Sequence, residues 1–399
     1  MTGLLNWFSQ IVSITLFNIR SLPQRIGSSA TAVLGIAGVV AVLVGVLSIA
    51  QGILRTMESS ASPENVVVLR SGATSEMMSV LAGDDTKIIA EGPGLARNEN
   101  GAISSPELFV VINLPMRSTG ADANVPLRGL TVVAPELRSG FKIVEGRMFE
   151  RGLNEVIIGV GARRQISGLD LGSTIFVAQE QWPIVGVFEA AGGLAESEIW
   201  VDASVLQPAY RRGNSFQVVY AKLESPDSFQ EYKDALTSDP RLNVKPVLEA
   251  DYYAAQSTVL YNTITGLGTL IAVIMGLGAI FGALNTMYTA VSSRAREIAT
   301  LRALGFHSGP VVISVLMESL LLALAGGTIG ALAAWLVFDG YRAATLNLSS
   351  FSQVAFAFDV SSTLLIRGIV FALFIGLIGG LFPALRAARQ SVSTALREL

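Results

Sequence analysis

The chain contains no cysteine and only one histidine, His307, among its 399 residues. The lack of cysteine excludes a disulfide scaffold, a thiol nucleophile and a cysteine zinc site. A single histidine argues against a histidine metal cluster and against a Ser-His-Asp triad. The net charge of −3 gives no electrostatic reason to expect nucleic acid as a partner.

Nucleotide-binding signatures are also missing from the sequence. There is no Gly-x-x-x-x-Gly-Lys-Ser/Thr phosphate loop, and no Gly-x-Gly-x-x-Gly spacing follows a predicted strand. We therefore expect no catalytic set, no metal site and no cofactor in this chain.

Charged side chains are scarce and unevenly distributed. They make up 15% of the chain, whereas a soluble domain has about 25%. Residues 56–255 carry most of the acidic side chains. The split predicts apolar membrane spans together with one ordinary water-soluble domain.

Four stretches are apolar and long enough to cross a bilayer, which takes about 20 residues. The first, 26–54, lacks charge and follows no cleavage site, so we expect an uncleaved anchor. The second charge-free stretch, 252–293, begins with polar residues, which predicts a helical stalk and a membrane entry near Gly266. The third and fourth spans are expected at 311–338 and 361–385.

Basic residues near the span ends give the orientation. If there are four spans, the arginine clusters before span one, between spans two and three and after span four all fall on one side. That side is predicted to be the cytoplasm. The large domain is then outside, which is the periplasm of a two-membrane bacterium, and the protein is a multi-pass protein of the bacterial inner membrane.

The expected fold class is a membrane α-helical protein with four transmembrane helices and a large inserted α+β extracytoplasmic domain. Residues 1–25 contain a dense apolar run with Trp7, which predicts either a helix in the cytoplasmic interface or a helix packed on the bundle. The predicted order is an interfacial helix at 1–25, span one at 26–55, the outer domain at 56–255, stalk and span two at 256–292, a cytoplasmic coupling loop at 293–310, span three at 311–338, a short outer loop at 339–360, span four at 361–385 and a cytoplasmic tail at 386–399.

The outer domain alternates short β-like runs with turn residues, which predicts two parts built on mixed strands. A weak helical pattern covers 76–81 and a better one covers 228–236. Asp84 and Asp85 lie among turn residues, where a solvated turn is favoured over a catalytic carboxylate pair. The candidate strands are 65–70, 108–112, 127–133, 155–158, 174–178, 183–188, 198–201 and 216–223.

The loop after span two is the most informative segment. Arg294, Ile298, Leu301 and Arg302 share helical spacing, which predicts a short amphipathic helix that ends at Gly305. Such a basic helix at the inner membrane face suits lipid headgroups or a partner protein, and its residues do not decide between the two.

Two charges and a pair of glycines lie within the predicted spans. Glu318 and Arg367 lie near opposite membrane faces, so we do not expect them to pair. For Arg367 we prefer snorkelling to the outer face, whereas Glu318 is either functional or bonded to a neighbouring helix. Gly278 and Gly282 have small-xxx-small spacing, which suits a dimer contact or packing within one protomer.

Several segments of the sequence carry a family resemblance. The loop Ser293-Arg-Ala-Arg-Glu-Ile-Ala-Thr-Leu-Arg-Ala-Leu-Gly and the run Met317-Glu-Ser-Leu-Leu-Leu-Ala-Leu-Ala-Gly-Gly resemble the MacB/FtsX type of ABC transporter permease. It extends to the close of the chain in Pro383-Ala-Leu-Arg-Ala-Ala-Arg. The outer domain adds Glu145-Gly-Arg-Met-Phe, Asn154-Glu-Val-Ile-Ile-Gly and Pro183-Ile-Val-Gly-Val-Phe, which are similar to the periplasmic core domain of that family.

The resemblance implies a dimer of permeases with two ATPase units on the cytoplasmic face, and mechanical transmission across the membrane. ATP and Mg²⁺ would be bound by a separate ABC ATPase subunit, because this chain lacks a phosphate loop. A periplasmic adaptor, an outer-membrane channel and membrane lipid are the other implied partners. The implied ATPase-coupling residues are Arg294, Arg296, Glu297, Ile298, Leu301, Arg302, Leu304 and Gly305.

Three functions follow as hypotheses. The first is a permease subunit for efflux, or for other substrate movement in the envelope. The second is a signalling transducer that activates an extracytoplasmic enzyme, as cell-division relatives do. The third is an anchored enzyme, which we rank last because no catalytic set is present.

Overall fold

A computed structural model describes residues 7, 10–13, 15, 26–99, 101–347 and 352–389. Most of the helix predicted at 1–25 lies outside these residues. The chain divides into two compact units. The helical unit comprises Met1–Gln51, Asn262–Tyr341 and Phe358–Leu399, and the sheet unit comprises Gly52–Tyr261 and Arg342–Ala357.

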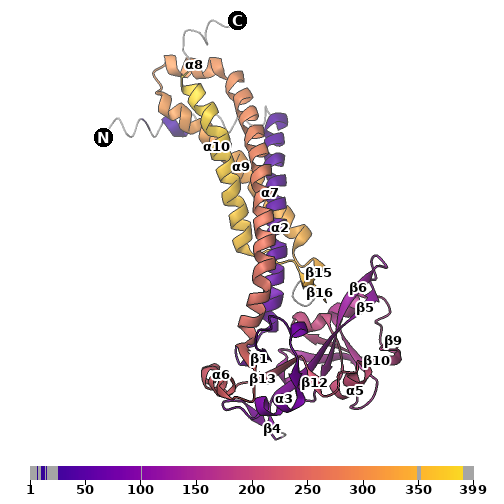
Figure 1. Cartoon of the computed structure of the whole chain (residues 1–399). Coiled ribbons are helices and arrows are strands. Elements are labelled where there is room, and N and C mark those ends of the chain that lie inside the picture. Colours follow the sequence, from indigo (N-terminus) through magenta and orange to yellow (C-terminus); the bar gives the residue numbers. More distant parts are fainter. Residues whose placement is uncertain are drawn as a thin grey trace. The chain divides into compact units, whose positions relative to one another are not determined.

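Among these described residues, four helices are long and apolar enough to cross a membrane. They are α2 (Ile26–Ser60), α7 (Glu249–Ser293), α9 (Ser308–Phe338) and α10 (Ser362–Arg389). Figure 1 shows them side by side, with the short helix α8 (Ala295–Ala303) between α7 and α9 in the chain. Helices α2 and α7 each contribute residues to both units.

Small residues let the helices of this unit approach closely. A Cβ atom added at Gly330 of α9 would clash with the carbonyl oxygen of Ala37 in α2. One added at Gly376 of α10 would clash with the Cβ of Ala323 in α9. Backbone contact of this kind is the usual way in which helices associate where hydrophobic burial gives no net gain.

The sheet unit is built on one ten-stranded sheet in the order β14-β1-β13-β5-β6-β11-β8-β10-β7, with β9 paired to β10. The β6–β11 and β8–β10 pairs are parallel and the other pairs are antiparallel. The strands are β1 (Asn65–Arg70), β5 (Ser104–Pro115), β6 (Asp122–Leu130), β7 (Phe141–Gly146), β8 (Val156–Gly159), β9 (Thr174–Val177), β10 (Glu180–Ala190), β11 (Ile199–Asp202), β13 (Val218–Lys222) and β14 (Val244–Leu248).

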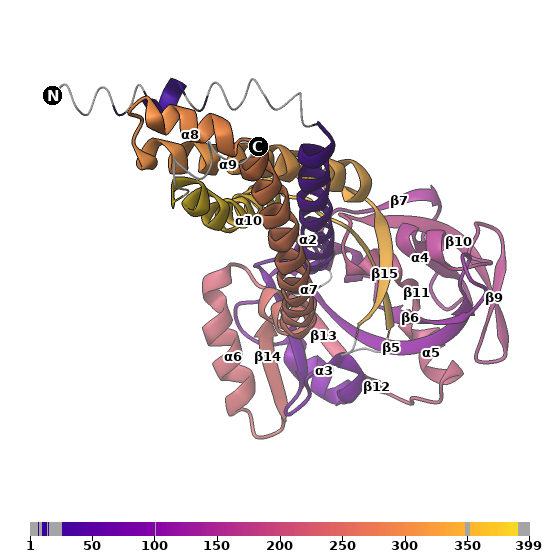
Figure 2. The same cartoon turned by 90° about the horizontal axis from the view of Figure 1, so that it is seen from above.

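Shorter elements complete the sheet unit, as Figure 2 shows from above. The short strands are β2 (Leu81–Ala82), β3 (Arg97–Asn98), β4 (Gly101–Ala102) and β12 (Ser215–Phe216). The helices are α3 (Gly83–Ala90), α4 (Val160–Gln165), α5 (Ala203–Ala209) and α6 (Phe229–Ser238), with 3-10 turns η2 (Glu76–Met78), η3 (Ala134–Leu137), η4 (Leu194–Ser197) and η5 (Pro226–Ser228).

The two predicted parts of this domain have separate cores but share one sheet. One core lies around β1, β13 and α6 and includes Val66, Val219 and Tyr232. Another lies around β8 and β10 and includes Trp182. The sheet is continuous because the long strand β5 pairs with β13 at its start and with β6 over the rest of its length.

One local prediction was wrong, and one predicted loop contains regular structure. The pattern at 76–81 forms only the 3-10 turn η2, because the chain turns at once into β2 and α3. The expected short outer loop at 339–360 contains a β-hairpin, with β15 (Arg342–Asn347) paired to β16 (Ser352–Ala357). The sequence of β16, Ser-Gln-Val-Ala-Phe-Ala, does not alternate polar and apolar residues, so its periodicity does not predict a strand.

Candidate functional site

The loop after α7 forms a separate helix because the backbone breaks on both sides of it. Arg294 leaves the helical region, with φ −109° and ψ 9°, and so ends α7 before α8 begins. At the other end Gly305 has φ +95°, a left-handed conformation that glycine adopts without strain. Helix α9 starts three residues further on, at Ser308.

Burial divides the predicted coupling residues into two faces. Arg294 and Ile298 are buried, and Leu301 packs partly against the same apolar cluster as Val311 and Ala384. The residues with helical spacing therefore do share a face, but that face points into the helical unit.

The opposite face of α8 is exposed. Arg296 and Glu297 lie on it, and Leu304 follows at the end of the helix with 74% of its surface exposed. Arg302 is half-buried and Gly305 is exposed. Direct contact with another protein is therefore open to Arg296, Glu297, Leu304 and Gly305, whereas Arg294 and Ile298 position the helix.

Arg294 forms a buried ion pair with Glu318 of α9. Its Nη1 lies 3.2 Å from Oε2 of Glu318, and both side chains are about 95% buried, with 6% and 5% exposed. A cavity of about 20 Å³, large enough for a single water molecule, adjoins the pair. A buried pair of this kind resists separation, because removing either partner would leave an uncompensated charge.

The intramembrane residues have different surroundings. Glu318 bonds a neighbouring segment, as one of our two alternatives stated, whereas Arg367 is exposed on α10. Beside Glu318, the Ser319 hydroxyl donates to the Gly376 carbonyl oxygen of α10 at 2.6 Å. Helix α8 is thus fastened to α9, and α9 to α10.

The glycines of α7 lie on two different faces. A Cβ atom added at Gly268 would meet Val46 of α2 at 2.5 Å, and one at Gly276 would meet Phe371 of α10 at 2.9 Å. At Gly278 and Gly282 the added atom would meet nothing within 4 Å. The small-xxx-small pair therefore does not pack within the described part of this protomer.

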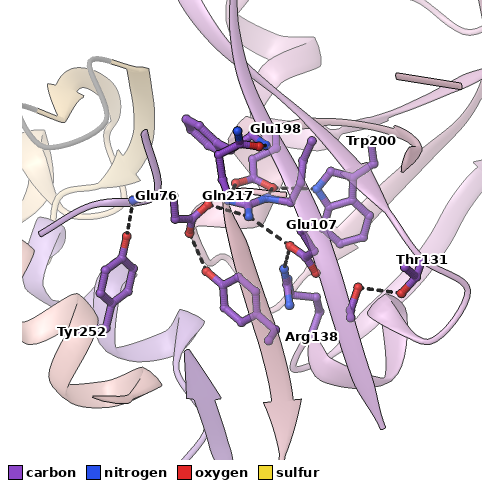
Figure 3. A network of polar contacts seen from close by, with 12 residues as sticks. Glu76, Glu107, Thr131, Arg138, Glu198, Trp200, Gln217 and Tyr252 are labelled. Carbon is purple, nitrogen blue, oxygen red and sulfur yellow. Dashed lines mark hydrogen bonds and ion pairs between the residues drawn. The ribbon is translucent and has the colours of Figure 1, made fainter. Parts of the chain in front are cut away.

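A buried ionic network lies in the sheet unit, which the sequence analysis missed. Arg128 of β6 binds Glu198 through two hydrogen bonds, of 2.9 Å from Nε and 2.8 Å from Nη2. Its Nη1 reaches Glu76 at 2.8 Å and Glu107 at 3.0 Å. Arg138 donates to Glu107 at 2.6 Å. Figure 3 shows these carboxylates turned toward one another.

The charged side chains of this network are almost fully buried, so each depends on its partners for compensation of its charge. The side chains of Arg128 and of its three carboxylate partners are at most 9% exposed. Burial raises the pKa of Glu107 above its ordinary value, although Arg138 and Arg128 act to lower it. The only sequence signal was a charged residue inside a predicted strand, since Arg128 stands between Leu127 and Gly129.

The first turns of α7 join this network. The Tyr252 hydroxyl accepts a hydrogen bond from the Glu76 backbone N–H at 3.3 Å, as Figure 3 shows. Tyr220 donates to Glu76 at 2.7 Å, and its oxygen lies 3.2 Å from the Tyr253 hydroxyl.

Glu249, the first residue of α7, ties the same region to the end of α2. Its Oε2 accepts the backbone N–H of Ser62 and the side-chain amide of Asn65, both at 2.9 Å. The Ser60 hydroxyl, at the end of α2, accepts the Leu194 N–H at 2.6 Å. The sheet-unit ends of α2 and α7 are therefore held by specific polar contacts.

The β15–β16 hairpin also docks on the sheet unit. Alternate residues Ser352, Val354 and Phe356 of β16 are buried, which is the period expected of a strand with one covered face. The Ala355 N–H donates to the Ser197 hydroxyl of η4 at 2.8 Å. At the base of the hairpin, in the helical unit, the Phe358 N–H donates to the Tyr341 carbonyl oxygen at 2.8 Å. The connection between α9 and α10 is thus a paired ribbon.

The structure gives no support for a catalytic pair at Asp84 and Asp85. Asp84 is exposed in the first turn of α3 and pairs with Lys87 at 2.8 Å. Among the described residues, no group of three or more His, Cys, Asp or Glu side chains is placed to hold a metal ion.

Known proteins share both parts of this architecture. Residues 29–239 match the family model of the MacB-like periplasmic core domain, and residues 269–392 match that of the FtsX-like permease C-terminal region. The permease YknZ of Bacillus subtilis is 27% identical over 57% of this chain and 57% of its own length. A macrolide export ATP-binding/permease protein, MacB, of Chlorobium phaeobacteroides is 24% identical over 92% of this chain.

The chain spans 57% of the length of that MacB relative. Among solved structures, the periplasmic region of MacB from Actinobacillus actinomycetemcomitans aligns with 51% of this chain and 96% of its own, at 12% identity and a TM-score of 0.39. The core-domain match alone covers more than half of the chain. With four apolar helices, a large inserted sheet domain and both family matches, the chain belongs to the MacB/FtsX-like family of ABC transporter permeases.

Proposed function

We propose that this chain is the membrane subunit of an ABC exporter in the bacterial inner membrane. A separate ATPase subunit, which binds ATP and Mg²⁺, would dock on α8 from the cytoplasm. Its ATP-driven movements would pass mechanically to the sheet unit outside the cytoplasm, where they would drive substrate export or other movement in the envelope.

The observation that carries this proposal is the division of α8 into a fixed face and an exposed face. The fixed face is held through Arg294 to Glu318 of α9, at 3.2 Å. The exposed face offers Arg296, Glu297 and Leu304. A protein bound to that face would shift α8 together with its neighbours, because the buried pair resists separation.

The sheet unit has two connections suited to receive such movement. The base of α7 enters the ionic network through Tyr252 and Tyr253. The ribbon between α9 and α10 docks on η4 through Ala355 and Ser197. Hydrogen bonds hold both connections. A displacement of α7, α9 or α10 would therefore be transmitted to the sheet unit through them.

The open glycines of α7 support a permease dimer. Gly278 and Gly282 lie where nothing else in the described chain comes within 4 Å of an added Cβ atom. A second permease would cover this face by close helix approach. Membrane lipid would cover the remaining apolar surface.

Export is the preferred role because of the relatives' names. The relative that aligns with 92% of this chain is named a macrolide export protein. On that ground we place a periplasmic adaptor and an outer-membrane channel among the expected partners. The transducer role has no comparable support.

Co-purification with the ATPase tests the proposal. The variant Arg296→Glu/Leu304→Asp changes only the exposed face of α8. A matched control, Arg212→Glu/Leu153→Asp, makes the same changes at exposed positions of the sheet unit. We expect the wild-type chain and the control to recover an ATP-hydrolysing partner and the α8 variant to lose it.

Retention of the ATPase by the α8 variant would move the coupling site elsewhere. Failure of the wild-type chain to recover any ATPase would refute the permease mechanism.

A further inference from the structure

The sheet unit has a groove of about 400 Å³, which is separate from the ionic network around Arg128. This volume lies in the range of sites for small ligands, about 300–1,000 Å³. The residues around it come from β7, α4, β10, η4 and β15 and from the loops beside β7 and β10. They are Gly140, Lys142, Val160, Arg164, Glu189, Ala191, Gly192, Glu196 and Arg342.

The two carboxylates in the groove are already engaged. Glu189 pairs with Lys142, whose Nζ lies 2.9 Å from its Oε2. Glu196 uses Oε1 to accept two backbone N–H groups, those of Ala190 at 3.0 Å and Gly192 at 2.8 Å. Their negative charge is therefore directed at groups other than the remaining arginines.

The two arginines of the groove are exposed and have no such engagement. Arg163, the neighbour of Arg164, forms an ion pair with Glu145 at 2.8 Å and is not among the residues that line the groove. Across residues 26–99, 101–347 and 352–389, neither Arg164 nor Arg342 forms an ion pair or a hydrogen bond through its side chain. The groove thus carries two guanidinium groups without a carboxylate partner.

The hairpin completes the groove. Arg342 is the first residue of β15, and the span α9 ends only four residues earlier, at Phe338. The guanidinium of Arg342 can line the same groove as Arg164 only while the hairpin is docked on the sheet unit. Occupancy of the groove would therefore respond to the helices that hold the hairpin.

We propose that this groove binds a phosphate group between Arg164 and Arg342. A guanidinium presents a planar fork of N–H donors that matches an oxyanion, and two of them neutralise a phosphate well. The phosphate has two chemical sources, the headgroup of an anionic phospholipid or a soluble phosphate. The short distance in sequence from Arg342 to the end of a span favours the lipid. Phosphate binding in this groove does not rest on the coupling function proposed for α8.

Native mass spectrometry of the full chain in mild detergent tests the site. The probes are dioctanoyl phosphatidylglycerol, dioctanoyl phosphatidylcholine and inorganic phosphate. We expect phosphatidylglycerol to bind the wild-type chain, and the variant Arg164→Ala/Arg342→Ala to lower its affinity at least about tenfold, which is about 1.4 kcal/mol. The variant Arg164→Lys/Arg342→Lys should recover part of the binding, because it retains the charge but loses the fork.

The matched control is Arg151→Ala/Arg212→Ala, which removes two exposed arginines of the same unit outside the groove. It should bind phosphatidylglycerol like the wild-type chain. Competition by millimolar inorganic phosphate would assign the site to soluble phosphates, and its failure would assign the site to lipid headgroups.

Three results would overturn the proposal. They are no binding of any probe to the wild-type chain, unchanged binding in the Arg164→Ala/Arg342→Ala variant, and an equal loss in the control. Circular dichroism that matches the wild type would show that the loss of binding is not a loss of fold.

Discussion

The two units each contain a buried ionic cluster, but the clusters differ in how many parts of the chain they join. In the helical unit, Arg294 and Glu318 are 24 residues apart and connect α8 to the next helix. In the sheet unit, Arg128 contacts carboxylates from η2, from β5 and from the residue between η4 and β11, the most distant of them 70 residues away. The pair of Arg294 and Glu318 holds the short helix α8 against α9, whereas the Arg128 network connects several strands and turns of the sheet unit.

The geometry of the clusters differs in the same sense. The contacts of Arg128 with its carboxylates lie at 2.8–3.0 Å. Arg294 has Glu318 at 3.2 Å and the largely exposed Glu297 at 4.0 Å. In both clusters, removing one member would leave an uncompensated buried charge. Each cluster is therefore expected to move as a unit with the elements that carry it.

The largest expected effect comes from breaking the network of the sheet unit. Arg128→Met leaves Glu76, Glu107 and Glu198 buried without their shared cation. Breaking a single buried pair costs about 3–5 kcal/mol, so we expect a large fall in the unfolding temperature of the sheet unit. Arg117→Met, which removes a half-exposed partner of Asp170, should change little and is the control. Equal unfolding temperatures for the two variants would show that the network does not hold the domain.

The second effect concerns the pair in the helical unit. Arg294→Glu and Glu318→Arg each place two like charges together, and each should cost about 3 kcal/mol and reduce ATPase coupling. The double variant reverses the pair and should restore most of both properties. ATPase activity of the purified complex and its thermal stability are the measurements. No recovery in the double variant would mean that the two residues act separately.

A smaller effect is expected where the hairpin docks. Ser197→Ala removes the acceptor of the Ala355 N–H and should cost about 1 kcal/mol. Hydrogen exchange of the Ala355 amide should become faster, whereas the exposed change Ser204→Ala should leave it unaltered. Unchanged protection of Ala355 in the first variant would contradict the docking contact.

The smallest effect is a pH dependence at the end of α6, which contrasts an exposed ion pair with the buried clusters. Hydrogen bonds from Arg241 lower the pKa of Asp239 from 3.8 to about 2. A lowered pKa in the folded state means that the stabilisation is present above pH 3.8 and is lost as the pH falls toward 2. Asp239→Asn should therefore reduce the pH dependence of the free energy of unfolding between pH 3.8 and pH 2 and leave it unchanged at higher pH. An unchanged pH dependence between pH 3.8 and pH 2 in the variant would contradict the assignment.

Several features followed from the sequence because they are local. Apolar runs longer than a bilayer requires predicted the four spans, and the fold class was confirmed. Short β-like runs between turn residues predicted strands such as Asn65–Arg70, which matches β1. The helix at 228–236 was predicted from capping and turn residues and corresponds to α6. Each of these depends on neighbouring residues alone.

Tertiary structure decided which side of each element meets which partner. Helical spacing placed Arg294 and Ile298 on one face of α8, but only packing against α9 and α10 made that face the buried one. The charge of Arg128 is visible in the sequence, whereas its partners come from segments that meet only in the folded sheet. The reason is that periodicity encodes the direction of a side chain within its own element, while a buried charge is tolerated only where distant segments bring it a partner.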